Sequence, residues 1–154
     1  MTTCNYFNIK YAQEQHDFII EKIGGLPGIK DRGLLDSALE FIKNDDYYPR
    51  FEDKLTHLVF SVVQSHPFLD GNKRTSIVLG SYFLQINGYS EYIVGHFMEY
   101  MEQLVLMITQ QSISKEDLCL FINLLINDLP FTEKLELKYL KGLQTIEMLK
   151  SEFE

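Results

Sequence analysis

The sequence has few of the features that mark secreted, membrane-spanning or metal-scaffold proteins. Its two cysteines, Cys4 and Cys119, are too few for a disulfide framework, and their spacing matches no zinc-binding pattern. Its apolar runs are far shorter than the roughly 20 residues that a membrane-spanning helix needs. Met1 to Lys10 is polar and lacks the apolar core of a signal peptide. We therefore expect a cytoplasmic protein with no membrane partner.

Positive charge is scarce as well. The chain has 14 Lys and Arg residues against 22 Asp and Glu residues, a formal net charge of -8. A protein with this balance does not attract polyanions as a whole, so we expect no direct nucleic-acid binding. A small basic cluster can still form a local anion site, and the adjacent pair Lys73 and Arg74 is the best candidate for one.

Apolar residues recur at three- and four-residue spacing along most of the chain, which is typical of amphipathic helices. One such stripe runs from Tyr11 to Ile23 and is stopped by the glycine pair that follows it. Later helices are predicted at 33–44, 55–65, 72–86, 98–109 and 115–127, and an amphipathic segment follows Pro130. The sequence shows no repeat or interdomain linker. It predicts an all-α fold, a single compact helical bundle that forms one domain over residues 1–154.

Two parts of this bundle stand apart from the regular helical pattern. The stretch 45–53 is polar and aromatic and contains Pro49, so we predict an exposed loop there, with a small β-hairpin as the alternative. The helix predicted at 72–86 is apolar around most of its circumference, so we expect it to be central and buried. The stretch just before it contains the residues that point to a function.

That stretch reads His66-Pro67-Phe68-Leu69-Asp70-Gly71-Asn72-Lys73-Arg74. Proline disfavours helical geometry in the residue before it, so the stretch is a loop that runs into the start of the next helix. The first turn of a helix has unpaired N–H groups and a positive dipole end, and both favour a bound phosphate. Gly71 allows the backbone to approach a ligand closely, because it has no Cβ.

The side chains of this stretch could bind a phosphate and its metal ion, and one of them could act as a general base. Asn72 can cap the helix or bind the ligand, while Lys73 and Arg74 add positive charge. Asp70 would repel bound phosphates unless a cation lay between them, and Mg²⁺ is commonly held by one or two carboxylates together with phosphate oxygens. An imidazole can accept a proton near neutral pH, so His66 is a candidate general base. These are the groups that phosphoryl-type transfer requires.

Each of these residues alone has an ordinary explanation: a loop histidine, an Asp-Gly turn and a solvated basic pair. Their occurrence together in nine residues between two apolar helices favours the functional interpretation. The remaining histidines, His16, His57 and His96, lie in or near predicted helices, and none is followed by a second metal ligand four residues later. We interpret these three as structural.

The stretch resembles the motif of the Fic/Doc family, commonly written HxFx(D/E)GN(G/K)R. The positions that match the motif are His66, Phe68, Asp70, Gly71, Asn72, Lys73 and Arg74. Upstream, the run Gly24-Gly25-Leu26-Pro27-Gly28 and Asp31 are similar to the N-terminal part of the Doc (death-on-curing) branch, and Asn87-Gly88-Tyr89 is similar to the usual end of the helix after the motif. The resemblance covers about residues 5–127. It leaves about 130–154 as an extra C-terminal helix.

The resemblance implies an all-α Fic-like fold and transfer from a nucleotide, such as ATP, to a hydroxyl group of a target protein. His66 would deprotonate that hydroxyl, Asp70 would hold Mg²⁺, and residues 71–74 would bind the phosphates. The loop at 45–53, with Tyr47 and Tyr48, would be the flap that positions the target.

The branch of the family decides which part of the nucleotide is transferred. AMP-transferring members usually carry a second glycine where this chain has Lys73, and a second arginine where it has Ile77. Both differences are shared with Doc proteins, which transfer the terminal phosphate. Gly71, in contrast, matches the AMP-transferring pattern, because Doc sequences often carry alanine there. The resemblance thus favours a kinase and leaves AMP transfer to a Ser, Thr or Tyr hydroxyl as the alternative.

Doc proteins act as toxins of toxin–antitoxin pairs, inhibiting translation by modifying a translation elongation factor. The resemblance implies a target of this kind, and an antitoxin partner that blocks the site. A nucleotide-binding or protein-binding module without turnover is a third hypothesis, which the complete motif disfavours.

Overall fold

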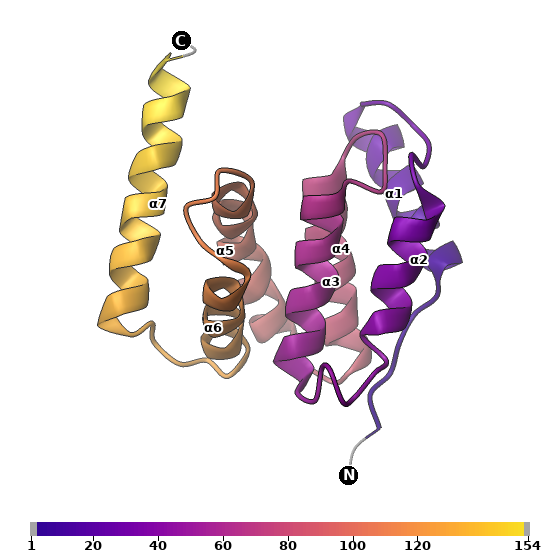
Figure 1. The fold of residues 1–154 in the computed structure, drawn as a ribbon, viewed down its shortest axis with the longest axis horizontal. Helices are drawn as coiled ribbons and strands as arrows, with labels where there is room; N and C mark the ends of the chain where they lie inside the picture. Colours follow the sequence, from indigo (N-terminus) through magenta and orange to yellow (C-terminus); the bar gives the residue numbers. More distant parts are fainter. Residues whose placement is uncertain (1–2, 153–154) are drawn as a thin grey trace.

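The computed structural model describes residues 3–152, and its regular structure is helical (Figure 1). The helices are α1 (Ile9–Ile23), α2 (Arg32–Phe41), α3 (Phe51–Ser65), α4 (Asn72–Ile86), α5 (Glu91–Thr109), α6 (Lys115–Ile126) and α7 (Glu133–Glu152). Within residues 3–152, strand-type pairing consists of one isolated antiparallel bridge between Ile29 and Phe68. The predicted all-α fold is confirmed. None of the helices in this range is both long enough and apolar enough to cross a bilayer.

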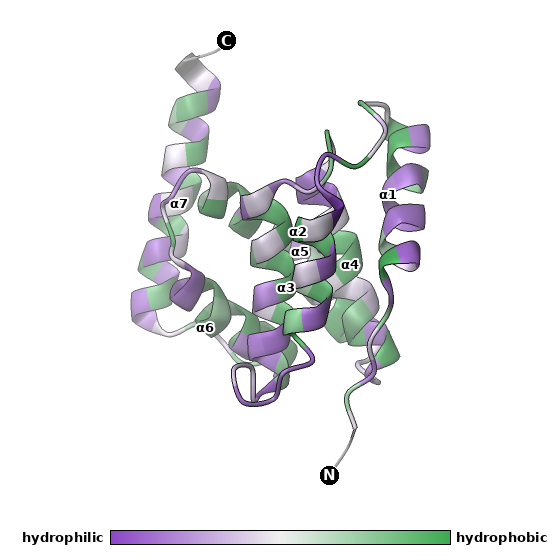
Figure 2. Cartoon of the chain, turned by 45° about the vertical axis from the view of Figure 1, so that its right-hand side comes forward, coloured by the Kyte–Doolittle hydropathy of each residue, from purple (hydrophilic) through white to green (hydrophobic). Residues whose placement is uncertain are grey.

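Helices α3 and α4 form the centre of the molecule, with α1 and α2 on one side and α5, α6 and α7 on the other (Figure 1). Nine of the 15 residues of α4 are buried, which confirms that this helix is central. Gly80 allows the close packing, because a Cβ there would lie 3.0 Å from side-chain atoms of both Val59 and Phe97. Figure 2 shows the apolar residues gathered inside the bundle and the hydrophilic ones along the outer faces of α1 and α7.

Local sequence signals explain where most helices begin. The side chains of Asn8, Asp31, Ser90 and Ser114 each accept a hydrogen bond from a backbone N–H of the following first turn. Helix α5 begins at Glu91, seven residues before the predicted start at 98. Ser90 is the cap that the periodicity argument overlooked, and the buried Val94 and Phe97 extend the apolar face of α5 back to it.

The stretch 45–53 forms no hairpin. The side chain of Asn44 accepts hydrogen bonds from the N–H groups of Asp46 and Tyr47, and its backbone carbonyl accepts one from Tyr48. These bonds close a tight turn, and α3 already begins at Phe51. The remaining residues are therefore too few to form two paired strands.

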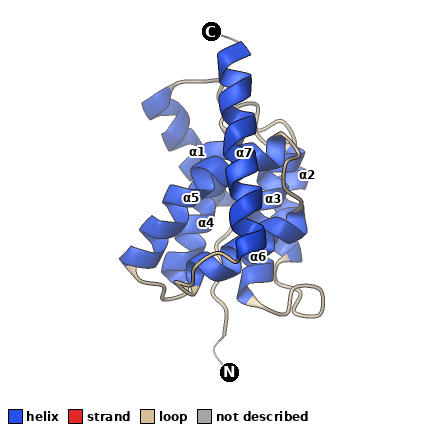
Figure 3. Ribbon diagram, turned by 90° about the vertical axis from the view of Figure 1, so that its left-hand side faces the viewer, coloured by secondary structure: helices blue, strands red, loops and turns tan. Residues whose placement is uncertain are grey.

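The segment after Pro130 forms α7, which lies on the outer face of the bundle, in front of the other helices in Figure 3. Its contact with α5 centres on Gly142, where an added Cβ would lie 2.5 Å from the sulfur of Met107. Tyr139 joins this helix to an aromatic cluster with Tyr100, Phe121 and Phe131. Helix α7 thus packs against the side of the bundle opposite α1 (Figure 1).

Candidate active site

The loop between α3 and α4 is held by its own buried residues. His66 ends α3 in a left-handed conformation, with φ 52° and ψ 61°, which turns the chain away from the helix axis. Phe68 follows with 1% of its surface exposed and anchors the loop in the core. The Asn72 side chain accepts a hydrogen bond from the Phe68 N–H and donates one to the Phe68 carbonyl, each at 3.0 Å. The side-chain amide of Asn72 therefore stabilises the loop.

The segment 24–31 lies along this loop and pairs with it. The N–H groups of Lys30 and Asp31 donate to the Pro67 carbonyl at 2.8 and 3.0 Å, and the Leu69 N–H donates to the Gly28 carbonyl at 3.2 Å. Sequence reasoning used this glycine-rich segment only as part of the family resemblance and missed its place beside the loop. Its glycines were the available signal, since backbone–backbone pairing at close range favours residues without a Cβ.

Asp70 presents its carboxylate at the exposed side of the loop. One oxygen, Oδ1, accepts a hydrogen bond from the Gly71 N–H at 2.8 Å, and Oδ2 accepts one from the Leu26 N–H at 3.2 Å. Each carboxylate oxygen can accept more than one bond, so both oxygens keep capacity for a further ligand. The carboxylate is thereby oriented by backbone groups from both sides of the site.

Gly71, the residue just before α4, adopts a conformation that favours glycine. Its φ is 76°, and an added Cβ would lie 3.3 Å from the Ile20 side chain. No side chain caps α4 at this position, in contrast to α1, α2, α5 and α6. The N–H groups of the first turn of α4 therefore have no capping side chain, and this leaves them available to an anion.

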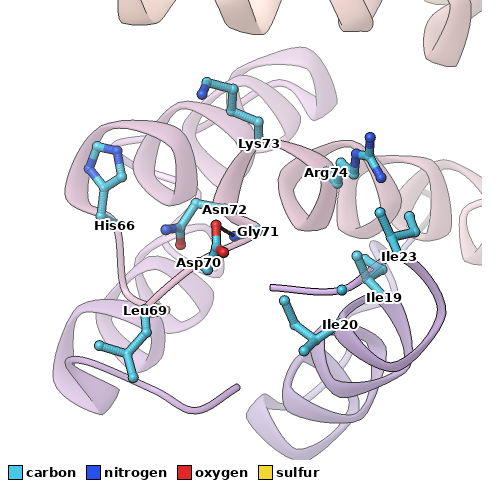
Figure 4. A pocket seen from close by; sticks show the side chains of 11 residues that line it. Ile19, Ile20, Ile23, His66, Leu69, Asp70, Gly71, Asn72, Lys73 and Arg74 are labelled. Carbon is cyan, nitrogen blue, oxygen red and sulfur yellow. Dashed lines mark hydrogen bonds between the residues drawn. The ribbon is translucent and has the colours of Figure 1, made fainter. Parts of the chain in front are cut away.

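These elements surround a cavity of about 370 Å³ (Figure 4). One wall belongs to the loop and the start of α4 and consists of His66, Leu69, Asp70, Gly71, Asn72, Lys73 and Arg74. The other belongs to the end of α1 and consists of Ile19, Ile20, Ile23 and Gly24. Pockets for small molecules typically begin at about 300 Å³. One polar, cationic wall and one apolar wall suit a ligand that has both an anionic and an apolar part.

The structure therefore brings together six of the eight residues predicted for the site: His66, Asp70, Gly71, Asn72, Lys73 and Arg74. It does not bring Tyr47 and Tyr48 to the cavity. Both precede the first residue of α3, whereas His66 follows the last, and a helix of 15 residues is about 22 Å long. Tyr48 instead lies beside His57, with its hydroxyl 3.1 Å from Nδ1, and burial raises the pKa of Tyr48.

Asp70 is the single carboxylate among the residues that line the cavity. No group of three or more His, Cys, Asp or Glu residues in the described part of the chain is arranged to hold a metal ion. A cation at Asp70 would therefore need most of its ligands from a bound phosphate and from water. That arrangement suits Mg²⁺, which keeps several waters and is usually bound through one or two carboxylates and substrate phosphates.

His16 is a residue near the site that sequence reasoning missed. It lies on α1 with 1% of its surface exposed, and its imidazole Nε2 is 2.6 Å from the backbone oxygen of Asp70. The available signal was its spacing from Ala12 and Ile19, which places it on the buried face of α1. A histidine on that face needs a polar partner, and the loop supplies one.

Comparison with known proteins identifies a family over the part of the chain that holds this cavity. The family model described as "Fic/DOC family" matches residues 6–84, which include every residue that lines the cavity. The Toxin Doc of Mycolicibacterium smegmatis is 41% identical over 69 residues, 42% of this chain and 53% of that protein. The Protein kinase doc of Escherichia phage P1 is 35% identical over 77 residues, 47% of this chain and 60% of that protein. The chain thus spans between about half and three fifths of the length of these relatives.

Proposed function

The chain belongs to the Doc branch of the Fic/DOC family, and on this basis we propose that it is a Doc-like toxin that transfers the terminal phosphate of ATP to a hydroxyl group of a target protein. The observation that carries this proposal is the convergence of His66, Asp70 and the uncapped start of α4 on one cavity. The proposed base, metal ligand and anion site thus lie within reach of one bound nucleotide.

In this proposal the side chain of His66 accepts the proton of the target hydroxyl. The hydroxyl oxygen forms a bond to the terminal phosphorus, the bond from that phosphorus to the bridging oxygen breaks, and ADP leaves. The N–H groups at the start of α4, together with Lys73 and Arg74, stabilise the negative charge on the phosphates. His66 is exposed at the mouth of the cavity, where a protein substrate has access to it.

Asp70 would hold Mg²⁺ that arrives with the nucleotide. The ion supplies charge neutralisation to the phosphates when bound. The backbone N–H groups of Leu26 and Gly71 orient the carboxylate for that role in advance.

Two residues of α4 favour phosphate transfer over AMP transfer. Lys73 stands where AMP-transferring relatives usually have glycine, and it lines the cavity. Ile77 stands where they usually have a second arginine, and it is 9% exposed and packed in the core. The name of the phage P1 relative, Protein kinase doc, agrees with this choice. Gly71 matches the AMP-transferring pattern, so protein adenylylation is the alternative function.

The target and partner belong to the same proposal. The target is a translation elongation factor whose modification inhibits translation in the cytoplasm, and an antitoxin protein covers the site.

The segment 24–31, which borders the loop of the cavity, takes over the target-positioning role that the sequence suggested for Tyr47 and Tyr48. Residues 1–154 form one catalytic domain, with a family core at about 5–127 and α7 as an addition.

A labelling experiment tests the proposal. Purified protein, Mg²⁺ and a cell lysate are incubated with ATP labelled at either the terminal or the α-phosphate, and labelled proteins are separated on a gel. We expect label from the terminal phosphate, loss of labelling in His66→Ala and Asp70→Asn, and full labelling in the control His96→Ala, which lies outside the cavity. Label from the α-phosphate alone would support AMP transfer, and nucleotide binding without any labelling would support a non-catalytic module.

A further inference from the structure

We propose that His16 is a positioning residue that holds Asp70 in place from the neighbouring helix α1. This inference rests on the proposed function in one respect, because it takes Asp70 to be the metal ligand. The contact itself is independent of that function: the imidazole of His16 approaches the backbone oxygen of Asp70 to 2.6 Å, across 54 positions in the sequence.

The chemistry of this contact determines the tautomer of the imidazole. A carbonyl oxygen can only accept a hydrogen bond, so Nε2 of His16 must carry a proton and donate it. The other ring nitrogen, Nδ1, is 3.7 Å from Oδ1 of Asp17, too far for a hydrogen bond. The bond to Asp70 is therefore the polar contact that stabilises this buried imidazole.

The same imidazole also packs against the loop before Asp70 and lies near the residue after it. Its ring stacks on Phe68, with a centroid distance of 3.9 Å and an angle of 6° between the planes. Its Nε2 also lies close to Gly71, where an added Cβ would be 3.6 Å away. One side chain of α1 thus holds Phe68 and the Asp70 carbonyl and lies beside Gly71, the residue just before α4.

Asp70 is held by hydrogen bonds to both its backbone oxygen and its carboxylate. Its backbone oxygen is held by His16 on the buried side, while its carboxylate accepts N–H groups from Leu26 and Gly71 beside the cavity. A peptide group whose carbonyl is fixed in this way cannot rotate freely, so the carboxylate stays directed toward the cavity. Hydrophobic packing would be served as well by leucine or phenylalanine at this position, whereas only a donor at Nε2 orients the peptide group.

Two variants separate this positioning role from packing. His16→Phe keeps a ring that can stack on Phe68 but removes the donor, and His16→Gln removes the ring but places an amide donor at a similar reach. The first measurement is the Kd of a non-hydrolysable ATP analogue with Mg²⁺, by calorimetry. We expect His16→Phe to weaken binding about tenfold, and His16→Gln to stay within about threefold of the unmodified protein.

Transfer kinetics give a second readout. His16 does not contact His66, so we expect the loss of the donor to raise KM for Mg²⁺–ATP and to leave the pH profile of kcat unchanged. Equal weakening by both variants, or nucleotide binding by His16→Phe at the level of the unmodified protein, would overturn the positioning role.

NMR of the unmodified protein tests the contact without any nucleotide and without any variant. The ¹⁵N shifts of the His16 ring should report the tautomer with the proton on Nε2, and a proton on Nδ1 alone would overturn the proposal. Failure of the unmodified protein to bind nucleotide would refute the proposed function, and the ring shifts would still decide whether His16 holds Asp70.

Discussion

The carboxylate of Asp70 lies directly against the backbone of Gly25, where an added Cβ would be 2.7 Å from Oδ2. The next residue, Leu26, donates its N–H to the same oxygen at 3.2 Å. Gly25 has a φ of +122°, a conformation that other residues rarely adopt. The absence of a side chain at Gly25 therefore allows the Asp70 carboxylate to lie this close to the glycine segment after α1.

Replacement of Gly25 by alanine should displace either Asp70 or the segment 24–28. We expect Gly25→Ala to lower kcat/KM for transfer by about tenfold or more, because small misplacements at a reacting centre have large effects on rate. Gly88→Ala is the matched control, since Gly88 also has a positive φ of +85° but has nothing within 4 Å of an added Cβ and lies outside the cavity. Similar strain in both variants should give similar losses of thermal stability, measured by melting curves. An equal loss of activity in the two would contradict the steric explanation.

Lys54 should contribute more to stability than other lysines, because it is buried and bonded. Its ammonium group donates to the Ile42 carbonyl at 2.7 Å and to the Asp45 carboxylate at 2.6 Å, with 3% of the residue exposed. Lys54→Met would leave the Ile42 carbonyl without this partner, so we expect a loss of about 1–3 kcal/mol in the free energy of unfolding, measured with urea. The control is Lys43→Met, whose exposed ion pair with Glu40 should be worth less than about 1 kcal/mol. Equal effects of the two substitutions would refute the special role of Lys54.

His57 should make the protein less stable as the pH falls from about 6.5 to about 4. Burial, together with the neighbouring charge of Lys115, lowers the pKa of His57 from 6.5 to about 4. The unfolded chain therefore binds the proton first, and the stability that neutral His57 contributes is present above pH 6.5 and lost as the pH falls toward 4. We expect a loss of about 1–2 kcal/mol over this window, after allowance for solvent screening of a half-buried group.

The groups around His57 allow a control for this pH dependence. Its Nδ1 lies 2.9 Å from the ammonium nitrogen of Lys115 and 3.1 Å from the Tyr48 hydroxyl oxygen, and Nε2 lies 3.2 Å from the Ser61 hydroxyl oxygen. Burial lowers the pKa of Lys115 and raises that of Tyr48, and among these neighbours His57 is the group whose ordinary pKa lies at the edge of this window. Denaturant melts of His57→Gln should therefore lose most of the slope between pH 6.5 and 4. If the stability of His57→Gln fell as steeply between pH 6.5 and 4 as that of the unmodified protein, other groups would cause the pH dependence.

Gly142 should be essential for the docking of α7 on α5, because it faces Met107 without room for a side chain. We expect Gly142→Leu to release α7, measured as faster amide exchange across residues 133–152, while the transfer rate stays within about twofold of the unmodified protein. Gln144→Leu, an exposed position two residues later on the same helix, is the control and should leave exchange unchanged. A large loss of transfer activity in Gly142→Leu would show that α7 supports the cavity from the far side of the bundle.

Most of the helices could be predicted from the sequence, because their start and stop signals are local. The helix predicted from about 72 to 86 has the bounds of α4, since Asn87-Gly88 closes it. The start of α5 was misplaced because the apolar pattern is weak around Gly95, and the Ser90 cap was not recognised. The role of the 45–53 loop was mispredicted because it came from the family resemblance alone, whereas the full length of α3 separates this loop from His66.

The sequence by itself determined the chemistry that the cavity can offer, because His66, Asp70, Gly71, Lys73 and Arg74 are neighbours in the chain and reach one cavity through local geometry. Only the tertiary structure decided what surrounds them. The packing of α1 against α4 brings His16 to the Asp70 carbonyl and the segment 24–31 alongside the loop. Contacts of this kind join residues tens of positions apart and depend on how helices pack, which local patterns do not encode.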